Sequence, residues 1–132
     1  MKITYDQTYQ TPLAEFGAEL VRMIKACAYT EISARFGYAV AYDRPPPDAI
    51  ESDIGYCLGG EGRSATIAMA AEARIFVKYF KQPNDCGLFG LVECFLPLDR
   101  DTGALLAELI VTTHQDEFHV CLEDVSYAAN FI

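Results

Sequence analysis

The first half of the chain carries apolar residues at helical spacing. Between Thr11 and Gly37 they recur every three or four positions, and the charged residues fall largely on the other side. The apolar positions are Leu13, Phe16, Leu20, Met23, Ile24 and Cys27. Thr11 suits the N-cap and Pro12 the first helical position. The pattern predicts an amphipathic helix lying on a core, and it leaves open a break within residues 29–36.

A second helix is predicted after a stiff connector. The prolines of the segment 43–47 can continue neither a helix nor a central strand. Asp48 followed by Glu51 fits a capping box, in which the two side chains accept backbone N–H groups of the first turn. The apolar residues that follow recur at helical spacing up to Gly59 and Gly60, which end helices readily. We therefore expect a short helix from Asp48 to the glycine pair.

The second half of the chain has the alternation of strands. We expect strands at 74–80, 88–96, 105–113 and 118–122, joined by short turns, and a short first strand at 2–6. The stretch Ser64–Ala73 fits helix or strand spacing equally well. No repeat or linker divides the chain, so residues 1–132 are predicted to form a single domain. The order of elements predicts an α+β fold, with two N-terminal helices packed on an antiparallel meander sheet of about four strands.

The last two predicted strands form a hairpin whose register can be derived from its apolar residues. A turn at Gln115–Asp116 places Leu109 opposite Leu122 and puts the apolar residues of both strands on one face. On the other face the expected pairs are His114 with Glu117, Thr112 with His119, Ile110 with Cys121 and Glu108 with Glu123. The last pair sets two carboxylates against each other, which costs some tenths of a kcal/mol when they are exposed.

The charge distribution makes this hairpin a candidate surface. The formal net charge is −9, and Arg100 is the last basic residue. Such a surface repels nucleic acid and anionic lipid and attracts basic proteins. The absence of a long apolar run or an apolar leader predicts a soluble cytoplasmic protein, without membrane or direct nucleic-acid binding.

Three interpretations of the acidic hairpin stay open: an ordinary solvated face, a surface that binds a basic partner, or a carboxylate–imidazole site. If the face binds a basic partner, the positive charges of that partner offset the repulsion between the carboxylates. In the third, Glu108, Glu123 and His119 would act as metal ligands or as an acid–base pair. The partner-binding candidates are Glu108, Asp116, Glu117, His119 and Glu123.

The sequence contains no motif specific for catalysis, a metal or a cofactor, so we expect none of these. The five cysteines form no C-x-x-C pair and are best explained as buried apolar residues, with Cys86 the most exposed. The glycine-rich run 59–64 lacks the lysine of a phosphate loop and follows a predicted helix. Asp99, Asp101 and Gly103 resemble the start of a calcium loop, but the spacing favours a hairpin turn.

The small size, the acidity, the two helices before a meander and the ending Glu117–Asp124 together resemble bacterial immunity proteins, such as those that protect against contact-dependent inhibition toxins. These proteins share no common motif, so the resemblance assigns no site residue. It implies a cytosolic inhibitor that binds a cognate toxin domain, often a basic nuclease, and blocks its active site or substrate surface.

Two other classes of function stay open. A secretion chaperone is also small, acidic and α+β, and it forms a homodimer with an exposed apolar patch for its client. A small enzyme with an unrecognised pocket is the other alternative, for which Cys86, His114 and His119 are the residues to test.

Overall fold

A computed structural model of the protein describes residues 1–131. Its elements are β1 (Lys2–Ile3), a 3-10 helix (Tyr5–Thr8), α1 (Gln10–Lys25), α2 (Tyr29–Phe36), α3 (Pro46–Gly59), β2 (Thr66–Ile67), β3 (Arg74–Tyr79), β4 (Leu88–Asp99), β5 (Ala104–His114) and β6 (Glu117–Ala128). The six strands form one antiparallel sheet in the order β1-β6-β5-β4, and both β2 and β3 pair with β4.

The predicted α+β class is confirmed, but its details need correction. The structure has three α-helices and six strands, rather than two helices and about four strands, and β1 precedes all the helices. The long predicted helix breaks at Cys27, whose φ of 54° is left-handed and ends α1 before α2 begins. Ser64–Ala73 is neither helix nor continuous strand, since only Thr66–Ile67 pairs with β4.

The helix starts differ from the predicted caps. α1 begins at Gln10, so Thr11 is already inside the helix and Pro12 lies in its first turn, where no N–H donor is needed. α3 begins at Pro46 and makes no side-chain capping bond, so the capping box predicted for Asp48 and Glu51 is wrong. Prolines at the start of α3 supply its preset φ instead.

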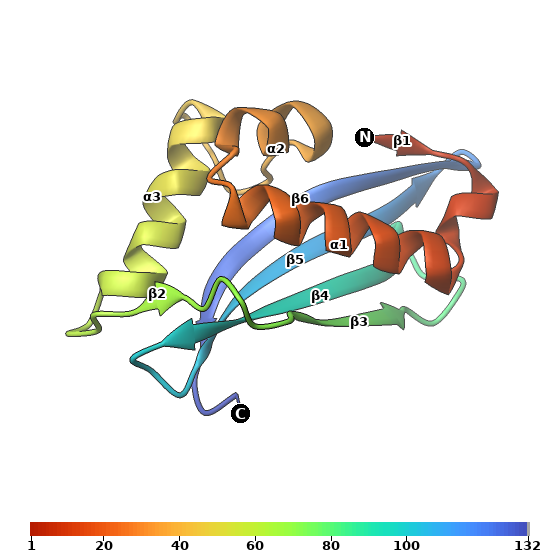
Figure 1. The fold of residues 1–132 in the computed structure, drawn as a ribbon. Helices are drawn as coiled ribbons and strands as arrows, with labels where there is room; N and C mark the ends of the chain where they lie inside the picture. Colours follow the sequence, from red (N-terminus) through yellow and green to blue (C-terminus); the bar gives the residue numbers. More distant parts are fainter. Residues whose placement is uncertain (132) are drawn as a thin grey trace.

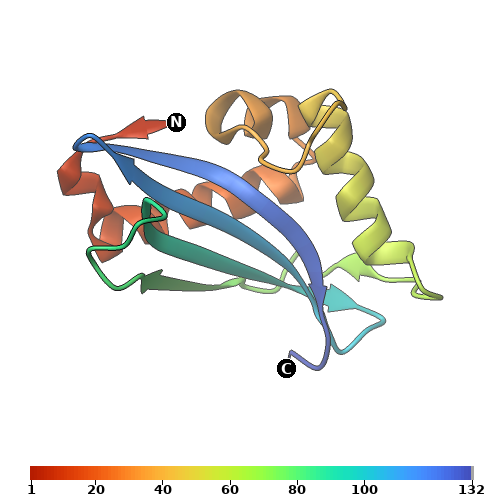
Figure 2. The same cartoon turned by 180° about the vertical axis from the view of Figure 1, so that it is seen from behind.

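The helices cover one face of a curved sheet. α1 crosses the sheet, and α2 and α3 pack beside it near β6 (Figure 1). Alternate residues of the central strands are buried against them, among them Val92, Cys94, Ala107, Leu109, Val120 and Leu122, all fully inaccessible. Seen from behind, none of the helices formed by residues 1–131 crosses the other face (Figure 2). We call this the open face, formed by the outward residues of β3 to β6.

The helix-covered face depends on a close approach of α1 to the sheet. Gly17 faces β3 and β4, and a Cβ atom at this position would lie 3.0 Å from side-chain atoms of both Ile75 and Val92. A larger side chain would have to push α1 away from the sheet, because packed cores have little free volume.

We therefore predict that Gly17→Leu lowers the free energy of unfolding by about 1–3 kcal/mol, the usual cost of overpacking a core. Gly55→Ala is the matched control, because Gly55 is exposed in α3 and a Cβ atom there would have nothing within 4 Å. This control should gain up to about 1 kcal/mol from helix propensity. Urea unfolding measures the stability of both variants. Equal stabilities of the Gly17→Leu variant and the natural protein would contradict the close packing of α1 on the sheet.

Candidate functional site

The outer half of the β5–β6 hairpin has the register expected from its apolar residues. Gln115 and Asp116 both have positive φ, at 51° and 64°, as a two-residue hairpin turn requires. The pairs from His114↔Glu117 to Leu109↔Leu122 are confirmed, including Thr112↔His119 and Ile110↔Cys121.

The expected pairing of Glu108 with Glu123 is wrong. A β-bulge at Glu123 inserts one extra residue into β6, and Glu108 pairs with Asp124 instead. Without the extra residue, strict alternation would turn Val125 out of the core. With it, Val125 lies opposite the buried Ala107 and is only 6% exposed. Burial of Val125 therefore favours the register that brings Asp124 beside Glu108.

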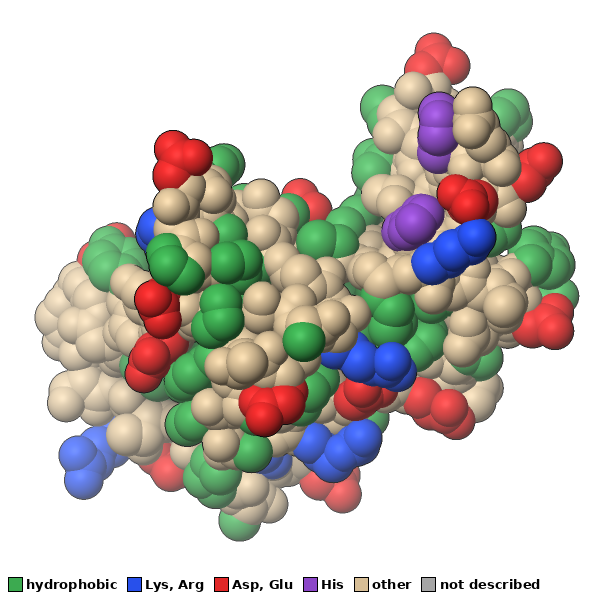
Figure 3. Space-filling view, turned by 90° about the horizontal axis from the view of Figure 1, so that it is seen from above, with side chains coloured by type: hydrophobic (Ala, Val, Ile, Leu, Met, Phe, Trp, Pro, Cys, Tyr) green, Lys and Arg blue, Asp and Glu red, His purple; other side chains and the backbone are tan. Residues whose placement is uncertain are grey.

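The negative charge of Glu117 at the hairpin tip is balanced by Lys2, from the N-terminal end of the chain. β1 pairs with β6 so that Lys2 lies opposite His119. The Lys2 Nζ atom donates to Glu117 Oε1 at 2.7 Å, and this contact holds the pKa of Glu117 below its usual range. The Nε2 atom of His119 lies 3.8 Å from the other oxygen of Glu117. Figure 3 shows the two histidines on the protruding tip with basic and acidic side chains beside them.

The open face carries a row of carboxylates that crosses three strands. Glu93 of β4 pairs with Glu108 of β5, which pairs with Asp124 of β6. We call these three residues the acidic row. Lys78 of β3 forms an ion pair with Glu93, with 2.7 Å between Nζ and Oε1, and the Glu93 side chain is 15% exposed. The row therefore has a base at its β3 end, while Glu108 lies between two carboxylates.

Apolar side chains flank the acidic row on the open face. The pair Leu91–Ile110 lies on one side of Glu93 and Glu108, and the pair Phe95–Leu106 on the other. Phe76 of β3 is opposite Glu93 and remains 46% exposed. Near the chain end, the Phe131 ring stacks on Phe95 with the ring centroids 4.5 Å apart. The carboxylates are thus half-buried within an apolar surface.

This environment disfavours the charge on Glu108. Its pKa is raised first by burial, and then by the negative charges of Glu93, Asp124 and Glu123. Lys78 acts in the opposite direction but more weakly. Burial also raises the pKa of Asp124, with a smaller contribution from Asp53. A cation brought to the row would relieve both effects.

The five predicted partner-binding residues form two groups. Asp116, Glu117 and His119 lie at the hairpin tip, whereas Glu108 and Glu123 lie in the middle of the sheet. Thr112, which pairs with His119, is four residues from Glu108 along β5, or about 13 Å at the usual rise of a strand. The tip and the acidic row are therefore separate surfaces.

Sequence reasoning missed Glu93 and Asp124. Glu93 could have been found, because Glu93 and Glu108 are equally far from the centre of the turn between β4 and β5 and must pair if that hairpin is regular. Asp124 could not have been found in the same way, since its pairing depends on the bulge.

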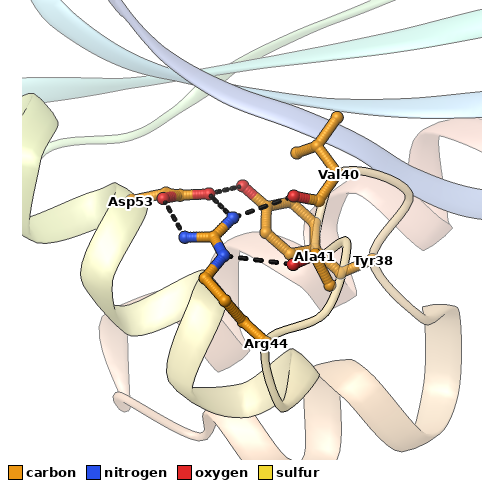
Figure 4. Close-up of polar contacts among 5 residues, drawn as sticks. All are labelled: Tyr38, Val40, Ala41, Arg44 and Asp53. Atoms are coloured by element: carbon orange, nitrogen blue, oxygen red, sulfur yellow. Dashed lines mark hydrogen bonds and ion pairs between the residues drawn. The ribbon is translucent and has the colours of Figure 1, made fainter.

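A second polar cluster joins the loop before α3 to that helix. Asp53 accepts a hydrogen bond from Tyr38 Oη at 2.6 Å and two from Arg44 at 2.8 and 3.1 Å (Figure 4). Arg44 also donates to the carbonyl oxygens of Val40 and Ala41. Arg44 is the main cause of the lowered pKa of Asp53. All three side chains are committed to one another, so the cluster fixes the loop rather than leaving a free reactive group.

A groove of about 440 Å³ lies between α3 and β6. Its lining consists of Asp53, Tyr56, Cys57, Glu61, Arg63, Asp124, Val125, Ser126 and Tyr127. Arg63 is held in place, because its Nε donates to the Cys57 carbonyl at 2.8 Å and its guanidinium carbon lies 4.0 Å from the centre of the Tyr127 ring. Asp124 thus belongs both to the acidic row and to the groove wall.

The residues proposed for an enzyme are not joined into a catalytic cluster. The loop holding Cys86 lies beside the end of β5, where Thr113 donates to the Gly87 carbonyl. Within residues 1–131, however, no hydrogen bond links Cys86 to His114 or His119, and no group of His, Cys, Asp or Glu residues is arranged to hold a metal. Cys86 is exposed as expected, but so is Cys27, which corrects the expectation that it is buried.

Comparisons of the chain with protein-family models, with curated proteins and with solved structures find no match. None of the helices described is long and apolar enough to cross a membrane.

We predict that Glu108→Gln raises the free energy of unfolding at pH 7, by some tenths of a kcal/mol to about 1 kcal/mol. The raised pKa means that the folded protein disfavours the charged form, so this cost exists above the raised pKa. It disappears as the pH falls through that pKa toward the ordinary carboxyl value. The gain from the variant should therefore shrink between neutral and mildly acidic pH.

Urea unfolding of the natural protein and the variant at several pH values measures this difference. Glu117→Gln is the control, because Lys2 lowers the pKa of that carboxyl and its charge favours the folded state. The control should show no gain at pH 7. A gain for Glu108→Gln that is the same at every pH would contradict the electrostatic explanation.

Proposed function

We propose that this protein is an inhibitor of the immunity type, which binds a cognate basic toxin domain through the open face of its sheet. The observation that carries the proposal is the acidic row of Glu93, Glu108 and Asp124, half-buried among apolar side chains on the face that no helix covers. The row lies beside the site expected from sequence and includes one of its residues, Glu108.

The energetics of the row favour a cationic partner. Neighbouring cross-strand carboxylates repel one another, and partial burial strengthens the repulsion. A lysine or arginine of the partner placed beside Glu108 would replace the repulsion between carboxylates by an attraction between opposite charges. Arginine is the better match because its planar guanidinium can bond two carboxylate oxygens and also stack on an aromatic ring such as that of Phe76.

The apolar surroundings of the row suit a protein interface. Energetically important contacts lie near the centre of an interface, where surrounding residues exclude water. Leu91, Ile110, Phe95 and Leu106 surround the carboxylates in this way. By contrast, a homodimer formed by this face around a two-fold axis at the row would bring two sets of carboxylates together, which the same repulsion opposes.

A basic nuclease domain is the toxin class that fits this surface. Nucleases hold phosphates with clusters of lysine and arginine, and an acidic protein surface can occupy such a cluster. The inhibitor would then block the substrate surface without performing any chemistry itself. Charge attraction between the two proteins would also accelerate association at low salt.

The test uses the protein encoded immediately upstream, where the proposal expects the toxin, produced in catalytically inactive form for binding measurements. We predict that Glu93→Gln combined with Glu108→Gln weakens the complex at least about tenfold, as expected when charged contacts at an interface are lost. Asp116→Asn combined with Glu117→Gln at the tip is the matched control with the same charge change, and it should alter the affinity much less.

Co-expression with the active toxin provides a second readout, in which the natural protein and the tip variant restore growth and the row variant does not. Unchanged affinity of the row variant would remove the open face from the interface. Absence of any complex with the folded toxin domain, together with binding to an unfolded secreted segment, would replace the inhibitor by the chaperone alternative.

A further inference from the structure

The outer edge of β6 is covered along only part of its length. β1 pairs with Phe118 and His119, and the Ala39 amide donates to the carbonyl of Leu122. From Asp124 to Ala128, β6 pairs with β5 on one side, and no other strand pairs with it within the residues that the structure describes. An uncovered strand edge offers unpaired backbone donors and acceptors to another chain.

The groove lies along this uncovered edge. α3 forms its opposite wall, and residues 124–127 of β6 form the wall on the sheet side. α3 and β6 run beside each other in both ribbon views (Figures 1 and 2). From the first to the last Cα atom these four residues span about 10 Å at the rise of a strand, which matches a short extended segment of about four residues.

The charges in the groove favour a basic occupant. Its lining contains the carboxylates of Asp53, Glu61 and Asp124 and the guanidinium of Arg63. Arg63 is directed to the Cys57 carbonyl and the Tyr127 ring, and Arg44 already neutralises Asp53. Asp124 has no ion-pair partner among the described residues, so it is the carboxylate available to a cation at the strand edge.

We infer that the groove between α3 and β6 binds an extended, basic segment of a protein partner, which adds to the β6 edge as a strand and places a lysine or arginine beside Asp124. Backbone hydrogen bonds would supply part of the affinity and the alternate side chains the specificity. This inference goes beyond the proposed function, because it concerns the strand edge rather than the open face and does not require a toxin.

The occupant is better matched by a peptide than by a second copy of this chain. Pairing two β6 edges around a two-fold axis would bring the Asp124 side chains of both copies close together. Arg63, the base in the groove lining, is already held by Glu61, the Cys57 carbonyl and the Tyr127 ring. A basic segment from another protein avoids the repulsion and uses the same backbone groups.

The experiment titrates the full ¹⁵N-labelled chain with a library of capped hexapeptides that alternate arginine or lysine with valine, isoleucine, threonine or tyrosine. We expect amide shifts at residues 123–128 and along the α3 wall of the groove. A matched peptide N-methylated at every internal backbone nitrogen keeps its charge but has no internal N–H group left to pair with a strand on either edge. It should bind at least about tenfold more weakly, because the pairing bonds are lost.

Two protein variants separate this site from the open face. Asp124→Asn should weaken peptide binding about fivefold or more, since it removes the paired charge. Glu93→Gln, at the far end of the acidic row, should leave peptide binding unchanged, because Glu108 lies between Glu93 and Asp124. The proposed function, by contrast, predicts that neutralising Glu93 together with Glu108 weakens the toxin complex. The amide spectrum of each variant also reports whether it folds.

Several results would overturn the inference. One is that no peptide of the library binds at millimolar concentration. Another is that the N-methylated peptide binds as tightly as its unmethylated counterpart. A third is that the peptide shifts only the amide signals of the open face. Peptide-independent dimerisation through residues 123–128 would assign the edge to a second copy instead. Each of these results leaves the toxin-binding test unaffected.

Discussion

The extra residue at Glu123 is the constraint on which the rest of the molecule's surface depends. A strand with strict alternation would place either Leu122 or Val125 in the core, but not both, since three positions separate them. The bulge allows both to be buried. The apolar core therefore sets the register of β6, and the carboxylates of that strand take the positions that remain.

Two surfaces follow from this register. On the open face, the shift sets Asp124 opposite Glu108, which already lies beside Glu93, and so completes the acidic row. At the strand edge, the same segment forms a wall of the groove facing α3. Asp124 belongs to both surfaces, so a single packing requirement in the core places charge on the open face and at an uncovered strand edge.

The position of the helices explains why these surfaces are accessible. α1 approaches the sheet closely at Gly17, and α2 and α3 pack on the same side, so the opposite face has no helix across it. The cluster of Tyr38, Arg44 and Asp53 then fixes the loop that leads into α3. A rigid support of this kind suits a binding surface, because little ordering is needed when a partner arrives.

The sequence by itself determined the features that depend on neighbouring residues: the amphipathic α1, the turn at Gln115–Asp116, the outer register of its hairpin and the acidity of the C-terminal third. Only the tertiary structure decided that Lys2 compensates Glu117, that Lys78 reaches Glu93 and that Glu108 meets Asp124. Periodicity and turn chemistry are local and can be derived along the chain. Pairing between distant segments depends on how the whole core packs. The same is true of the bulge at Glu123, which allows Val125 to be buried.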